Sequence, residues 1–154
     1  MSSTLHAALL FLHVLSVVVW IGGMAFSHLC LRPAILHVLE GSQRLRLWQA
    51  VFERFFPLVW VAVTLILASG AALLAHVGMA QAPRGWHAML LLGTVMAAVF
   101  VNVQLGPYAA FRRAMATEDW AAAAAQQGRI RARVSFNLVL GIATIACATL
   151  GLAF

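Results

Sequence analysis

The sequence predicts an all-α fold, a polytopic four-helix bundle inside a membrane. Hydrophobic residues make up 64% of the 154 residues and charged residues only 9%. Soluble domains are about 45–50% apolar and about 25% charged. A soluble domain of this length buries only about 70% of the surface that its unfolded chain exposes. It could not hide so much apolar surface, so soluble proteins, disordered chains and disulfide-stapled modules are excluded.

Four long apolar stretches predict the spans, at residues 5–31, 56–77, 86–108 and 134–154. Each has about 20 residues or more, enough to cross a hydrocarbon core about 30 Å thick. The first stretch lacks the basic start of a signal peptide and exceeds its usual apolar length. We therefore expect a permanent helix there, and a single transmembrane domain over residues 1–154.

The connection between the first two spans is amphipathic. In residues 42–55, Leu45, Trp48 and Phe52 share one helical face, and arginines lie elsewhere. This pattern predicts a short interfacial helix in the first cytoplasmic loop. Pro33 and Pro57 are expected to mark turns on either side of it.

The basic residues predict the topology. All ten are arginines, and nine of them fall in the first and third connections, leaving Arg84 on the opposite side. The positive-inside rule places the arginine-rich side in the cytoplasm. Both termini would then be periplasmic, in the inner membrane of a bacterium. The net charge of +6 is thereby attributed to membrane orientation, and no nucleic-acid partner is expected.

Four of the six histidines fall on the predicted outward side. His6 and His13 lie seven residues apart in the first span, which is two helical turns and nearly one face. His76 ends the second span and His87 begins the third. Met79 and Met89 lie close to them in sequence. Ionisable residues at membrane depth normally face the bundle interior and have a partner, which makes His13 the most informative of the set.

These residue types favour copper as the ligand. Imidazole and thioether groups together suit Cu(I), and no Asp or Glu falls on the outward side. We therefore predict a metal site of His13, His76, His87, Met79 and Met89, with His6 as a possible further ligand, in a copper-handling protein that is not an enzyme.

A b-type haem is the alternative. His13 and His87 could serve as its axial ligands, with Gly22, Gly23 and Gly70 making room for the macrocycle. The protein would then be an oxidoreductase that exchanges electrons with a quinone or oxidises a porphyrinogen. A third possibility is a non-catalytic subunit, whose histidines only stabilise packing.

Several short motifs resemble the CopD family of membrane proteins. The first is the run from His13 through Trp20 to Gly22 and Gly23, followed by Leu31-Arg32-Pro33. The others are Phe55-Phe56, Trp60, Ser69-Gly70, Trp86-His87 and the arginine-rich third connection. The resemblance covers nearly the whole chain and implies copper resistance or uptake across the inner membrane. It is compatible with a periplasmic copper carrier as partner and with a homodimer.

A more distant likeness is to HemJ, a small haem-containing protoporphyrinogen oxidase. His13, Trp20 and Gly23 resemble its first helix, and His87 loosely resembles the start of its third. Met89 stands where that family has a lysine, and this chain has no lysine. The resemblance therefore implies a haem held by His13 and His87 rather than the oxidase activity.

Overall fold

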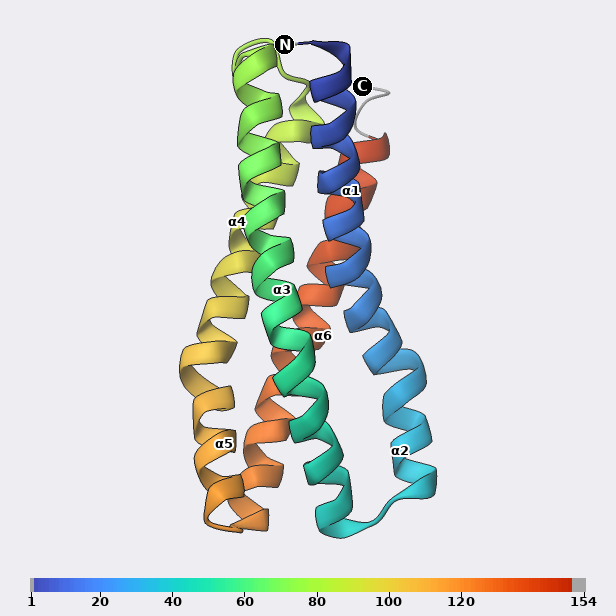
Figure 1. Ribbon diagram of the computed structural model, residues 1–154, viewed down its shortest axis with the longest axis vertical. Helices are drawn as coiled ribbons and strands as arrows, with labels where there is room; N and C mark the ends of the chain where they lie inside the picture. The colour runs from blue at the N-terminus through green and yellow to red at the C-terminus, as the bar shows by residue number, and fades with distance from the viewer. Residues whose placement is uncertain (1, 151–154) are drawn as a thin grey trace.

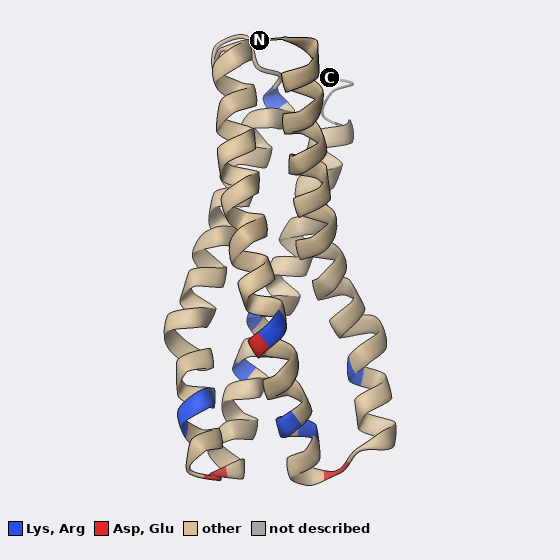
Figure 2. Ribbon diagram, viewed as in Figure 1, with Lys and Arg blue, Asp and Glu red and all other residues tan. Residues whose placement is uncertain are grey.

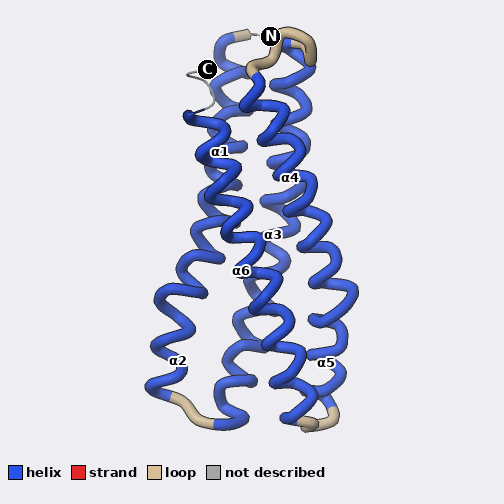
Figure 3. The backbone as a smooth tube through the Cα atoms, turned by 180° about the vertical axis from the view of Figure 1, so that it is seen from behind, coloured by secondary structure: helices blue, strands red, loops and turns tan. Residues whose placement is uncertain are grey.

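Four long helical rods form the bundle in the computed structural model, which describes residues 2–150 (Figure 1). The described residues are helical apart from Ser2 and short connections at residues 39–40, 78–83 and 117–119 (Figure 3). The first rod is α1 (Ser3–Phe26), η1 (Ser27–Leu31) and α2 (Arg32–Val38), and the second is α3 (Gly41–Val77). The third is α4 (Arg84–Val103), η2 (Gln104–Tyr108) and α5 (Ala109–Ala116), and the fourth is α6 (Trp120–Leu150).

The four predicted spans are confirmed as helices long and apolar enough to cross a membrane. The end of the fourth, residues 151–154, lies outside the described residues. The rods have 36, 37, 33 and 31 residues, whereas about 20 residues cross the hydrocarbon core. At about 1.5 Å per residue, each rod is roughly 15–25 Å longer than the core is thick.

The connections expected between the spans are therefore mostly helix. All ten arginines lie on helical residues, nine of them toward the end of the bundle at residues 39–40 and 117–119 (Figure 2). We call this the arginine end. The opposite end, where α1 starts and residues 78–83 connect α3 to α4, is called the histidine end.

The segment expected to be a short interfacial helix is the first part of α3. Its apolar face of Leu45, Trp48 and Phe52 is buried within the bundle. The helix also continues through Pro57, so the expected turn is absent. Burial of these large side chains offsets the cost of a proline inside a helix, which is about 3 kcal/mol.

Pro33 likewise lies inside a continuous rod, in the first turn of α2. The π-helical segment η1 immediately precedes α2, and η2 contains Pro107. A proline has no N–H and its ring crowds the carbonyl four residues earlier. Local widening of the helix accommodates both effects, so the chain absorbs these prolines without a turn.

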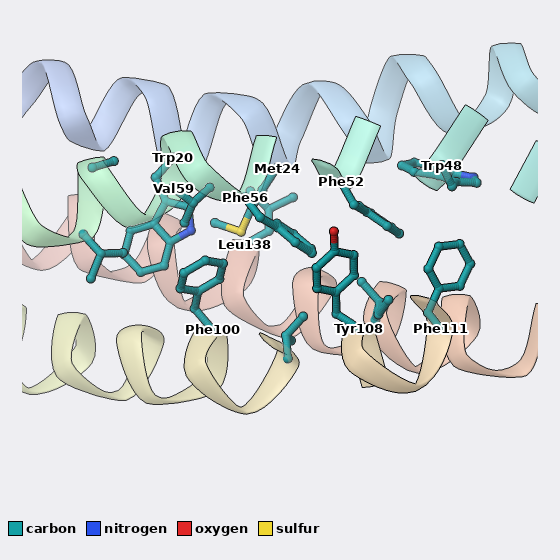
Figure 4. Close-up of a cluster of buried hydrophobic side chains, with 14 of the residues drawn as sticks. Trp20, Met24, Trp48, Phe52, Phe56, Val59, Phe100, Tyr108, Phe111 and Leu138 are labelled. Atoms are coloured by element: carbon teal, nitrogen blue, oxygen red, sulfur yellow. The ribbon is translucent and has the colours of Figure 1, made fainter. Parts of the chain in front are cut away.

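The rods form two antiparallel pairs joined by aromatic side chains. α1 packs mainly on α3, and α4 packs mainly on α6. On α3, Phe52 stacks on Phe56 at 5.0 Å, and between the pairs Tyr108 meets the Phe56 ring edge-on at 4.7 Å (Figure 4). Phe100 contacts Phe56 and Trp20 in the same manner. This aromatic core lies between the middle of the bundle and the arginine end.

Gly23 permits the close contact between α1 and α3. A Cβ atom at Gly23 would lie 2.3 Å from the Phe55 ring, whereas one at Gly22 would have nothing within 4 Å. We expect Gly23→Leu to lower the free energy of unfolding by about 1–3 kcal/mol, because the packed ring has to move. Thermal unfolding in detergent measures the effect. Gly22→Leu is the matched control, and equal losses in the two variants would contradict this packing.

Candidate functional site at the histidine end

His13 makes a polar contact between α1 and α3. Its Nδ1 lies 3.0 Å from the Ser69 Oγ, and both side chains are at least partly buried. The Ser69 hydroxyl donates its hydrogen to the Leu65 carbonyl, so it accepts from the His13 Nδ1–H. That assignment leaves the His13 Nε2 with an unshared electron pair, the form in which imidazole binds a metal.

Two of the three glycines expected to make room for a haem are already covered by side chains. A Cβ at Gly70 would lie 3.3 Å from the His13 Cε1, so the imidazole itself occupies that space. The Phe55 ring fills the space above Gly23. Gly23 and Gly70 therefore leave no room for a macrocycle, contrary to the role expected for them, whereas a Cβ at Gly22 would have nothing within 4 Å.

The packing of α1 on α3 also shows how far along the bundle axis two more histidines lie. Because the helices are antiparallel, seven residues outward from His13 and seven residues outward from Ser69 lead to the same level. Those positions are His6 and His76. Both side chains are exposed, and they lie about 10 Å beyond the His13–Ser69 pair.

The position of α4 along the bundle axis, relative to α1, follows from the surroundings of Gly141 on α6. A Cβ there would lie 2.9 Å from the Ile21 Cδ1 and 3.3 Å from the Met96 Cε, so Ile21 and Met96 share a level. α1 and α4 both run away from the histidine end (Figure 1). His13 precedes Ile21 by eight residues and His87 precedes Met96 by nine. His13 and His87 therefore lie at similar depths along the bundle.

The candidate donors thus fall into two tiers. The inner tier is His13, His87 and Met89, and the outer tier is His6, His76 and Met79. His87 is exposed, and its Nδ1–H donates to the Pro83 carbonyl at 3.3 Å, which again leaves Nε2 with its electron pair. Within residues 2–150, no three His, Cys, Asp or Glu side chains come close enough to hold a metal together. A metal held here would therefore need thioethers or fewer than three imidazoles.

A buried polar residue of the fourth span lies near the middle of the bundle, away from the candidate donors. Asn137 is buried, and it donates from Nδ2 to the Met96 carbonyl of α4 at 3.0 Å, so it hydrogen-bonds between two helices. Ser69 is the residue that sequence reasoning missed as a partner of His13. The available signal was its spacing, because Ser69 precedes His76 by the same seven residues that separate His6 from His13.

The comparison with protein families decides the classification. The family model described as CopD, copper resistance protein D, matches residues 49–150, about two thirds of the chain. The chain belongs to the CopD family. Neither the curated proteins nor the solved structures contain a match to it. The more distant HemJ likeness is not supported by these comparisons.

Membership in the CopD family implies a multi-pass membrane protein of copper resistance or handling. The matched region begins within α3, so it includes Ser69, His76, Met79, His87 and Met89. His6 and His13 lie on α1, before it. The His13–Ser69 contact joins α1 to α3, and so to the region that the family model matches.

Proposed function

We propose that this CopD-family protein binds Cu(I) at its histidine end, for copper uptake or resistance. The outer tier would capture the ion, and the inner tier would receive it within the bundle. The observation that carries the proposal is the His13–Ser69 hydrogen bond, which holds an imidazole at membrane depth with its Nε2 electron pair available.

The chemistry of this end supports a soft monovalent cation. Its candidate donors are imidazoles and thioethers, and Arg84 is the only Asp, Glu, Lys or Arg side chain that the described residues place there. Without carboxylates, the end offers little to Mg²⁺ or Ca²⁺. His76 lies in the last turn of α3, where the helix dipole also favours a cation.

The orientation belongs to the same proposal. Nine arginines at one end of the bundle support a cytoplasmic arginine end and a periplasmic histidine end, in a bacterial inner membrane. The tiers would then face the compartment from which copper arrives. A periplasmic copper carrier, a quinone and a homodimer remain predictions.

The function is tested by titrating the purified protein with Cu(I) in competition with a chelator, alongside an absorption spectrum from 350 to 650 nm. We expect a colourless protein that binds Cu(I). Binding of haem, seen as a Soret band that is lost in His87→Ala, would overturn the proposal, as would the absence of Cu(I) binding.

Capture by the outer tier has its own test. We expect His6→Ala/His76→Ala to weaken Cu(I) binding by about tenfold or more, because two donors are lost together. His37→Ala is the control, since His37 is an exposed histidine in α2, toward the arginine end. Equal effects of the outer-tier and His37 variants would contradict a role for the outer tier.

A further inference from the structure

A large open cavity lies at the arginine end, far from the candidate copper donors. It has a volume of about 640 Å³ and is lined by α2, the start of α3 and the first half of α6. In Figure 1, α2 diverges from α3 and α6 in this region. A smaller pocket of about 30 Å³ shares Arg32, Trp48, Gln127 and Arg131 with it and reaches His28.

The cavity carries three positive charges and no negative one. Arg32, Arg44 and Arg131 line it, and no Asp or Glu does. Arg44 is oriented by donating to the carbonyls of Leu36 and Leu39. Arg32 and Arg131 form no hydrogen bond or ion pair through their side chains within residues 2–150. The one ion pair in that range joins Arg46 to Glu118, outside the cavity lining.

The rest of the lining is largely apolar. Ile35 on α2 and Leu45 and Trp48 on α3 are buried side chains of this lining, and Trp120 contributes a second indole. A ligand that fits therefore combines an anionic group with hydrocarbon. Guanidinium groups bind phosphate oxygens with two parallel hydrogen bonds, which makes a phosphate the best match for the charged part.

The depth of the cavity selects the source of that phosphate. Arg32 follows the first apolar stretch directly, and Arg131 lies three residues before the fourth begins. Both therefore lie where the hydrocarbon core ends and lipid headgroups begin. Basic pockets between helices at this level are suited to anionic headgroups.

We propose that this cavity is a binding site for an anionic phospholipid of the leaflet at the arginine end. The phosphate lies between Arg32 and Arg131, with Arg44 at the rim, and an acyl chain follows the apolar lining that includes Ile35 and Trp48. The site is separate from copper binding. It joins α2 to α6, two elements that diverge here, through a ligand that each of them contacts.

The test is native mass spectrometry of the purified protein with added phosphatidylglycerol. We expect a bound lipid that is retained at least tenfold better than phosphatidylcholine. The variant Arg32→Gln/Arg131→Gln should lower phosphatidylglycerol retention at least tenfold. Inorganic phosphate in large excess should displace little of the lipid, because it lacks the hydrocarbon part.

The control variant is Arg113→Gln/Arg129→Gln, which removes the same charge from the same end without touching the cavity lining. An equal loss in the control would show general charge attraction and overturn the proposal. Equal retention of phosphatidylcholine would do so too, as would displacement by phosphate alone. If the double variant does not fold, lipid retention is measured with Arg131→Gln instead. The exposed Arg131 side chain forms no hydrogen bond or ion pair with the described residues, so this change should not disturb the fold.

Discussion

Replacement of His13 by alanine should weaken Cu(I) binding by at least about 100-fold. His13 is the only donor candidate held at depth by a side-chain hydrogen bond from a second rod. Loss of a partner that merely orients a metal-binding histidine typically lowers affinity by about 10–100-fold, and loss of the ligand itself should exceed that range. Competition titration against a Cu(I) chelator measures the change in dissociation constant.

His28→Ala is the matched control for this experiment. His28 forms the corresponding contact toward the other end of the bundle, where its Nδ1 lies 3.4 Å from the Ser135 Oγ. Removing it deletes an imidazole of similar surroundings without touching either tier. If both variants bound copper equally well, His13 would be a packing residue and the proposed route through the inner tier would be wrong.

Ser69 extends the same test to a residue that cannot be a copper ligand of the expected kind. Ser69→Ala should weaken Cu(I) binding by about 10–100-fold, because the His13 ring loses the acceptor that fixes its tautomer and orientation. Ser16→Ala is the control, since the buried Ser16 hydroxyl bonds only to the Leu12 carbonyl of its own helix. A similar loss in both serine variants would indicate general destabilisation.

Replacement of Phe52 by alanine should lower the free energy of unfolding by about 3–5 kcal/mol, the range for large-to-small changes in a packed core. Phe52 is 6% exposed and contacts four other aromatic rings. The variant removes the stacking partner of Trp48 and Phe56, and it leaves a cavity facing Tyr108 and Phe111. Unfolding in mixed micelles with a denaturing detergent reports the change.

Phe136→Ala serves as the comparison, because Phe136 is 53% exposed on α6. Its truncation should cost far less, since it opens no internal cavity. Similar losses at the two positions would mean that the aromatic core does not join the two helix pairs as described. Copper titration of the folded Phe52 variant then separates stability from binding.

The four helices could be predicted from the sequence because apolar runs of this length have few alternatives. Their true lengths could not, because Pro57 was interpreted as a turn. The signal for continuity was nonetheless present. Buried residues recur every three or four positions on both sides of the proline, including Leu45, Trp48, Phe52 and Val59. Tertiary packing of that face, rather than local preference, decides that the helix continues.

The candidate site was predictable in its residue types and in the end of the bundle where they gather. Its division into two tiers was not, because depth depends on how the rods are aligned. Gly141 and the His13–Ser69 contact supply that alignment, and both join residues more than forty positions apart. The sequence also could not show that the space beside Gly23 is filled, since only the fold brings the Phe55 ring there.

The aromatic contacts join the two helix pairs in only one part of the bundle. The pair of α1 with α3 and the pair of α4 with α6 form two arms, and aromatic rings hold these arms together from Trp20 toward the arginine end. Beyond Trp20 at the histidine end, no aromatic pair among the described residues joins the arms, and residues 78–83 connect them along the chain. His13 lies on one arm and His87 on the other, so an ion bound by both would draw the two arms closer together at the histidine end. Spin labels on the two arms would register that closure as a shorter distance.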